Sequence, residues 1–192
     1  MKKTLSILLI SILMVGMFGC STKKFDQTAT PEKGDTIATI TTTMGIVKIK
    51  FFEDLAPEIV KNFTTLAQDG YYDGLVFHRV IEGFMIQGGD PKGNGTGGHS
   101  YKGEGTTLED EIAPELSHVR GAISMANRGP DTNGSQFFIV HKDATYLDGG
   151  YSIFAQVYEG MDIVDSIAVV DVDSNDKPLT DVVIESIEIT TL

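Results

Sequence analysis

The feature that most constrains how this chain can fold is a series of short apolar runs separated by turn-forming residues. Such runs, each bounded by Gly, Pro, Asn or Asp, occur at 75–81, 84–87, 121–126, 136–140 and 153–158. Runs of this length favour β-strands, because helices of globular proteins usually need about ten residues or more. The 21 glycines among 192 residues fit a chain with many turns and loops.

Side-chain periodicity completes the expected set of elements. Alternation of apolar residues predicts two strands that pair as a hairpin, 36–43 and 46–51, and a last strand at 182–189. Helical spacing predicts two helices, one beginning at Pro57 and one at Met161. The fold class expected is mainly β, a closed eight-stranded antiparallel barrel capped by two α-helices.

The N-terminal residues are typical of a bacterial lipoprotein signal. Two lysines precede the apolar stretch 4–18, which is shorter than the ~20 residues needed to span a bilayer. Cys20 follows after Gly19 and is the only cysteine in the chain. We interpret 1–19 as a signal peptide and Cys20 as the site of lipidation by acyl chains such as palmitate. A flexible tether is then expected over 20–35, and one folded domain over 36–192.

Charge and cysteine content limit the possible partners. With 15 basic and 27 acidic residues, the net charge of −12 argues against binding to nucleic-acid phosphates. A single cysteine excludes an internal disulfide and a cysteine-built zinc site. The expected protein is a monomer in the cell envelope, outside the cytoplasm and lipid-anchored to a bacterial membrane.

Several familiar motifs are incomplete here. Gly93–Gly98 fits a dinucleotide-loop pattern, but the residues after it cannot begin the helix that would hold a phosphate. The stretch 171–182 begins like a calcium loop but lacks its glycine and its final glutamate. The four histidines lack metal-ligand spacing, and Ser135 lacks the elbow motif of a nucleophile. No metal, cofactor or covalent nucleophile is therefore predicted.

Two segments place Arg, Asn or Gln within or beside apolar strand residues. They read FHRVIEGFMIQGGD at 77–90 and SMANRGPDTNGSQFFI at 124–139. Burying such polar groups costs free energy unless they are hydrogen-bonded or used. A single residue of this kind is more often an ion-pair partner or a satisfied sheet residue, so only the two segments together carry a functional signal.

Together with NGTGG at 94–98, these segments resemble three signature stretches of the cyclophilin family of peptidyl-prolyl isomerases, in the order found in that family. The resemblance extends from about Thr36 to Leu192. It implies an eight-stranded antiparallel barrel with two capping helices and a shallow groove on its outer surface. The expected partners are proline-containing peptides and unfolded or exported proteins.

The resemblance also assigns roles to residues of the groove. The expected catalytic residues are Arg79, Gln87 and Gln136, of which the two glutamines are expected to orient Arg79 and the substrate. Other residues are expected to bind substrate, because they line the proline pocket, pair with the peptide backbone or lie at the rim of the groove. They are His78, Phe84, Met85, Ala126, Asn127, Phe138, Tyr146, Leu147 and Tyr151.

The chain departs from the common family pattern at the rim of the groove. Tyr146 stands where the family often has Trp, and Tyr151 stands where it often has His. Arg128 adds a cation beside the groove. These differences bear on ligand preference more than on the chemistry.

Peptidyl-prolyl isomerisation agrees with the lack of a nucleophile. An X–Pro bond turns against a barrier of ~20 kcal/mol because amide resonance gives the C–N bond double-bond character. No bond between heavy atoms forms or breaks, so the useful groups are a donor to the prolyl nitrogen and an apolar pocket for the ring. A guanidinium is charged at every relevant pH, and exclusion of water strengthens its hydrogen bond.

The sequence predicts a peptidyl-prolyl cis-trans isomerase that assists the folding of exported proteins at a membrane surface. An alternative is a binding module of the same fold, such as a chaperone for proline-containing peptides or an adhesin. A hydrolase is a distant third. Arg79 favours the isomerase, because a module that only binds needs no donor at the prolyl nitrogen.

Overall fold

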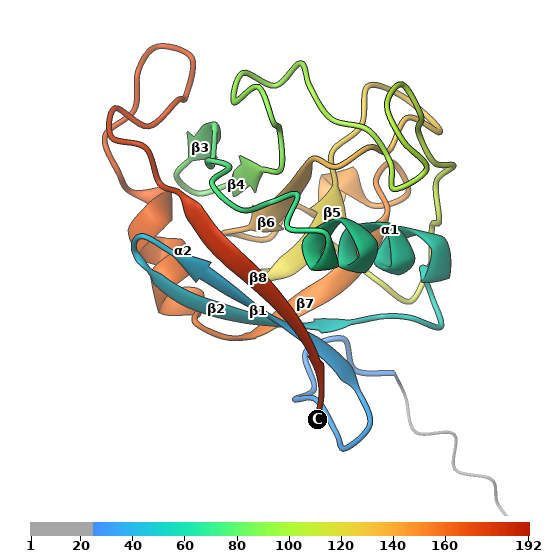
Figure 1. Ribbon diagram of the computed structural model, residues 1–192. Coiled ribbons are helices and arrows are strands. Elements are labelled where there is room, and N and C mark those ends of the chain that lie inside the picture. Colours follow the sequence, from blue (N-terminus) through green and yellow to red (C-terminus); the bar gives the residue numbers. More distant parts are fainter. Residues whose placement is uncertain (1–24) are drawn as a thin grey trace, which may run out of the picture.

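Eight antiparallel strands form one sheet that curls into a half-barrel (Figure 1). The computed structural model describes residues 25–192. The strands are ordered β3-β4-β6-β5-β7-β2-β1-β8 across the sheet. Their bounds are β1 (Thr36–Thr42), β2 (Gly45–Phe51), β3 (Arg79–Ile81), β4 (Met85–Gly88), β5 (Ala122–Met125), β6 (Phe137–Val140), β7 (Ile153–Glu159) and β8 (Ile184–Thr191). The mainly β prediction is confirmed, and β1 and β2 form the predicted hairpin.

The sheet is open, so the prediction of a closed barrel is wrong. The outermost strands, β3 and β8, do not pair with each other. Strand β3 has only three residues, because residues 75–78 of the predicted run 75–81 are not part of the strand that pairs with β4. The segment 75–78 meets the residues before β8 in one isolated bridge, between Val76 and Val183. One bridge brings the two edges together without a continuous ladder.

Two α-helices and one 3₁₀ turn complete the domain: α1 (Pro57–Gln68), α2 (Met161–Ala168) and η1 (Thr145–Leu147). Both α-helices lie where helical spacing predicts them, and they stand well apart in Figure 1. Pro57 occupies the first turn of α1, where its missing N–H costs no helical hydrogen bond. The Glu111 carboxylate accepts the next two N–H groups, from Glu58 and Ile59, and replaces a side-chain cap.

Strands β5 and β6 are buried on both faces, which explains why their sequences are apolar except for Ser124. Successive side chains of a strand point to opposite faces. Phe137 therefore joins the main core, where its ring lies 5.3 Å from that of Phe63 in α1. Phe138 joins a second, smaller apolar cluster with Met85. This second cluster is the base of the groove described below.

The expected tether differs from the structure over 25–35, because this segment lies against the domain. Gln27 is 9% exposed, and its Nε2 donates to the Ser117 carbonyl at 2.9 Å and to Gln156 Oε1 at 3.0 Å. The signal peptide 1–19 and the lipidation site Cys20 lie outside the described residues. Among the described residues, no helix is long and apolar enough to cross a membrane.

Candidate active site

Neighbouring strands bring four side chains into one row across the sheet. Arg79 of β3 lies opposite Gln87 of β4. Gln87 lies opposite Phe138 of β6, which in turn lies opposite Ser124 of β5. Opposed residues share a face and have Cβ atoms about 5 Å apart. The sheet itself therefore sets the spacing between the guanidinium and the apolar side chain of Phe138.

Three side chains of this row, those of Arg79, Gln87 and Phe138, line a small apolar hollow of about 70 Å³. Phe138 is 5% exposed, and its ring packs edge-to-face on Tyr151 at 5.8 Å. A ring held by such contacts keeps its orientation without a ligand. Five of the residues expected to bind substrate line the hollow together with Arg79 and Gln87: Phe84, Met85, Phe138, Leu147 and Tyr151.

Gln87 and Gln136 are hydrogen-bonded to each other and, among the described residues, not to the side chain of Arg79. The Gln87 Nε2 donates to Gln136 Oε1 at 2.9 Å, and the Gln136 Nε2 donates to the Gly97 carbonyl at 2.8 Å. Within residues 25–192, neither amide is hydrogen-bonded to the guanidinium, which differs from the role expected from the sequence. Both glutamines do line the groove.

The guanidinium of Arg79 has an acidic partner that sequence reasoning missed. Its Nε lies 3.5 Å from Oδ2 of Asp176, which belongs to the loop between α2 and β8. The Asp176 carbonyl also accepts the Val80 N–H at 2.8 Å, so this loop is joined to β3 through the main chain. In the sequence, Asp176 stood out only as part of the incomplete calcium-loop motif.

His118 is a second residue that sequence reasoning missed. Its buried ring stacks on Phe138, with 5.9 Å between centroids and 11° between planes. The Nδ1 lies 2.7 Å from Asp148 Oδ1, and the Nε2 lies 3.2 Å from Ser124 Oγ. Burial lowers the pKa of His118, although Asp148 opposes this shift. The neutral ring, held at both nitrogens, forms a firm support behind the apolar hollow.

His78 and Tyr146 lie at the margins of the hollow. His78 is 6% exposed, and among the described residues neither ring nitrogen has a hydrogen-bond partner. Burial lowers the pKa of His78. His78 lines a larger open cavity that also contains Arg79 and Gln87. Tyr146 is 74% exposed, and its ring lies 6.1 Å from that of Phe84, at the rim.

The residues after β5 form the wall of a neighbouring hollow. The Ala126 N–H donates to the Gln136 carbonyl at 2.9 Å. Ala126 and Asn127, which are expected from the resemblance to pair with an extended peptide, both line this hollow. The Arg128 Nη2 donates to the Gly95 carbonyl at 3.4 Å, and both residues line this hollow. The cation expected beside the groove therefore lies at this second hollow.

The glycine-rich loop 93–98 is already hydrogen-bonded to an anionic group of the chain, the Asp90 carboxylate. The Asp90 side chain is buried and accepts the backbone N–H groups of Lys92, Asn94 and Gly95. Burial would raise the pKa of Asp90, but these N–H donors outweigh it and hold the pKa below its ordinary value. The loop thus serves as a wall of the groove. Among residues 25–192, no three His, Cys, Asp or Glu side chains are grouped as metal ligands.

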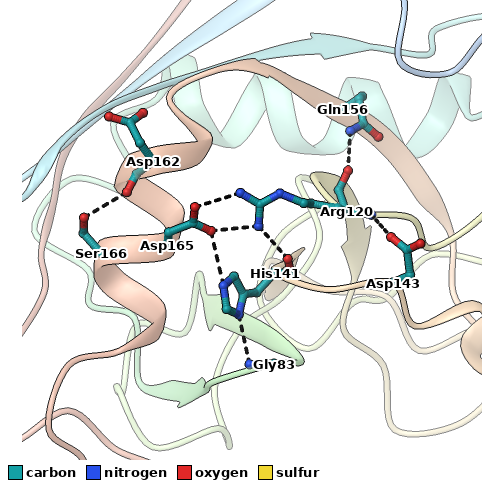
Figure 2. A network of polar contacts seen from close by, with 8 residues as sticks. All are labelled: Gly83, Arg120, His141, Asp143, Gln156, Asp162, Asp165 and Ser166. Atoms are coloured by element: carbon teal, nitrogen blue, oxygen red, sulfur yellow. Dashed lines mark hydrogen bonds and ion pairs between the residues drawn. The ribbon is translucent and has the colours of Figure 1, made fainter.

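A polar network fastens the turn that carries Phe84 to helix α2 (Figure 2). The Gly83 N–H donates to His141 Nδ1 at 2.9 Å, and His141 Nε2 lies 3.2 Å from Asp165 Oδ1. Arg120 donates to the two Asp165 oxygens at 2.7 and 2.8 Å. These bonds hold the pKa of the Asp165 carboxyl below its usual value. Helix α2 therefore helps to fix the position of Phe84 at the edge of the apolar hollow.

Comparison with known proteins identifies the family of this chain. A family model described as cyclophilin type peptidyl-prolyl cis-trans isomerase/CLD matches residues 37–189. The chain belongs to the cyclophilin family. The match covers almost the whole described domain. The resemblance found in the sequence motifs is confirmed.

Curated relatives support the same family at high identity. Peptidyl-prolyl cis-trans isomerase cyp15 of Rhizopus delemar is 52% identical over 155 residues, which are 80% of this chain and 24% of that protein. Peptidyl-prolyl cis-trans isomerase-like 1 of Neurospora crassa is 50% identical over 144 residues, which are 74% of this chain and 87% of that protein. The chain thus spans about a quarter of the first relative and most of the second.

A solved structure shares the fold. The cyclophilin type peptidyl-prolyl cis-trans isomerase of Cryptosporidium parvum is 39% identical and superimposes with a TM-score of 0.79, covering 82% of this chain and 99% of that one. The same protein has been solved in the presence of the dipeptide Ala-Pro.

Proposed function

We propose that this cyclophilin isomerises X–Pro bonds of exported proteins outside the cytoplasm, at a bacterial membrane surface to which a lipid on Cys20 anchors it. The observation that carries the proposal is the N-terminal pattern of two lysines, the apolar stretch 4–18 and the lone Cys20 before polar residues. Cys20 precedes Phe25, the first described residue, by five positions. That length of chain spans at most about 18 Å, so the anchor would keep the domain close to the bilayer.

The geometry of the groove supports rotation about a prolyl bond without covalent chemistry. The apolar hollow beside Phe138 can hold the pyrrolidine ring and exclude water. Arg79 lies at the same hollow and can donate to the prolyl nitrogen, whose lone pair becomes basic once the amide twists. Because this bond strengthens as the amide loses planarity, it stabilises the transition state more than the bound ground state.

Replacement of Cys20 tests the anchor. Cys20→Ser removes the acylated thiol, so the variant should remain unprocessed or leave the membrane fraction, and it should lose labelling by an alkyne analogue of palmitate. Ser21→Ala is the matched control and should be processed, labelled and retained like the wild type. Because several acyl chains hold firmly, extraction of the wild type should need detergent. A Cys20→Ser protein that is still processed and membrane-bound would exclude the lipoprotein form.

A further inference from the structure

We propose that Asp176 is a positioning residue for Arg79, held in place by a turn that the side chain of Asp173 builds. The proposal rests on the catalytic role proposed for Arg79. It gives a function to the acidic segment 171–176, which resembled an incomplete calcium loop in the sequence.

The first observation is that, among the described residues, no polar group other than Asp176 pairs with the guanidinium of Arg79. Within residues 25–192, the Asp176 carboxylate is the one polar partner of the Arg79 side chain, at 3.5 Å from Nε. The glutamines expected to orient Arg79 are hydrogen-bonded to each other and to the Gly97 carbonyl. Without Asp176, the long Arg79 side chain would have no fixed direction across the hollow.

The second observation is that hydrogen bonds fix the turn around Asp176. The Asp173 carboxylate accepts the N–H groups of Asn175 and Lys177, at 2.8 and 3.0 Å. The Asp173 N–H donates to the Lys177 carbonyl at 2.8 Å, and the Asp176 N–H donates to the Asp173 carbonyl at 3.1 Å. The Lys177 and Asn175 N–H groups lower the pKa of Asp173, so this arrangement is complete at neutral pH. A side chain that satisfies its own turn in this way holds the backbone in one conformation.

The third observation is the backbone strain at Asp176. Its φ is +62°, in the left-handed region, and Asp131 is the other non-glycine residue in the described chain with a positive φ. A residue with a Cβ is disfavoured in this region relative to glycine, and such residues cluster at functional sites. Glycine would suit the backbone better at position 176. An aspartate there has a clear use, because its carboxylate reaches Arg79.

The contact with Asp176 can orient the guanidinium of Arg79 and still leave most of its N–H donors available to a substrate. A guanidinium carries five N–H donors, and a partner at Nε leaves the four on the terminal nitrogens for a substrate. Both side chains are partly open to solvent, at 43% and 44% exposure. Exposed pairs are weak and are screened by salt. We therefore expect Asp176 to tune the rate by a modest factor that falls as ionic strength rises.

The experiment compares variants of the chain 25–192 by NMR exchange on an uncharged proline peptide. Asp176→Asn keeps the shape and tolerates the left-handed backbone but lacks the charge. It should lower kcat/KM about three- to fivefold, as expected for one exposed ion pair, with the dissociation constant of the peptide unchanged. Asp171→Asn, on the same loop, is the matched control and should behave like the wild type. At 1 M salt the difference between wild type and Asp176→Asn should disappear.

Two further measurements separate positioning from a structural role. Asp176→Gly relieves the strained φ, so its melting temperature should be unchanged or higher while its kcat/KM falls as in Asp176→Asn. In an Arg79→Ala background, Asp176→Asn should have no further effect, since the residue acts through the guanidinium. An Asp176→Asn enzyme with wild-type kcat/KM, or the same loss in both backgrounds, would overturn the proposal. Full activity in Arg79→Ala alone would instead overturn the catalytic role on which it rests.

Discussion

At the scale of single residues, the mechanism proposed for the groove depends on a donor, Arg79, whose charge does not change with pH. Arg79→Ala should lower kcat/KM about 10²–10³-fold, the usual cost of one preorganised donor, while peptide affinity changes much less. Arg79→Lys should restore little, because an ammonium lacks the planar fork and the Nε that contacts Asp176. The measurement is isomerisation kinetics with a parallel binding titration. Near wild-type turnover in Arg79→Ala would refute the mechanism, and unchanged melting would show that the loss is chemical.

His118 provides a residue-scale prediction about pH. Burial lowers its pKa in the folded state below the ordinary 6.5, so below that pH the unfolded chain binds more protons than the folded one. The free energy of unfolding should therefore fall as pH drops from 7 to 5, by at most about 1.4 kcal/mol per pH unit for one histidine. Urea unfolding at several pH values measures this change.

The control for this prediction is His118→Gln, which cannot be protonated in this range. The pKa of His78 is lowered by burial as well, so the wild type and the variant share that contribution and only their difference reports His118. The free energy of unfolding should decline less steeply with falling pH in His118→Gln. Equal slopes in the two proteins would show that His118 has the same pKa in the folded and unfolded states.

At the scale of elements, the sequence identified those parts whose side chains repeat with a period. Helix α1 was predicted because Ile59, Phe63 and Leu66 recur at helical spacing after Pro57, and all three are buried. The 3₁₀ turn η1 is three residues long, too short for any period to show. Closure of the barrel was predicted wrongly because periodicity identifies strands and not the pairing of their edges.

The residues of the candidate site likewise fall into two groups, those that the sequence could identify and those that it could not. Residues within one continuous motif, such as Arg79 and Gln87, could be named from the sequence because the motif is long and specific. His118 and Asp176 could not, because each acts through a contact with a distant segment. His118 meets Asp148, which lies 30 positions away in the chain, and Asp176 meets Arg79 across the open edge of the sheet. Only the fold brings such pairs together.

At the scale of the whole molecule, the N-terminal segment and the apolar hollow share one connected set of contacts. Gln27 bonds to the backbone of Ser117, whose hydroxyl donates to Asp148 at 2.6 Å. Asp148 in turn holds the His118 ring that stacks on Phe138. The segment 25–35, expected to be a free tether, is therefore part of the folded unit.

This arrangement predicts how the start of the chain affects stability. A chain beginning at residue 34 lacks the three hydrogen bonds of Gln27 and the packing of Phe25 on Phe52, whose rings lie 5.8 Å apart. At a net value of roughly 0.5–1.5 kcal/mol for each bond, it should be about 1.5–4.5 kcal/mol less stable than a chain beginning at residue 25. Its melting temperature should fall by about 3–18 °C. Gln27→Ala in the longer chain should reproduce most of this loss, whereas Thr30→Ala, at an exposed position of the same segment, should not. Equal melting temperatures for the two chains would show that the segment contributes nothing to the stability of the fold and that it is a free tether, as the sequence predicted.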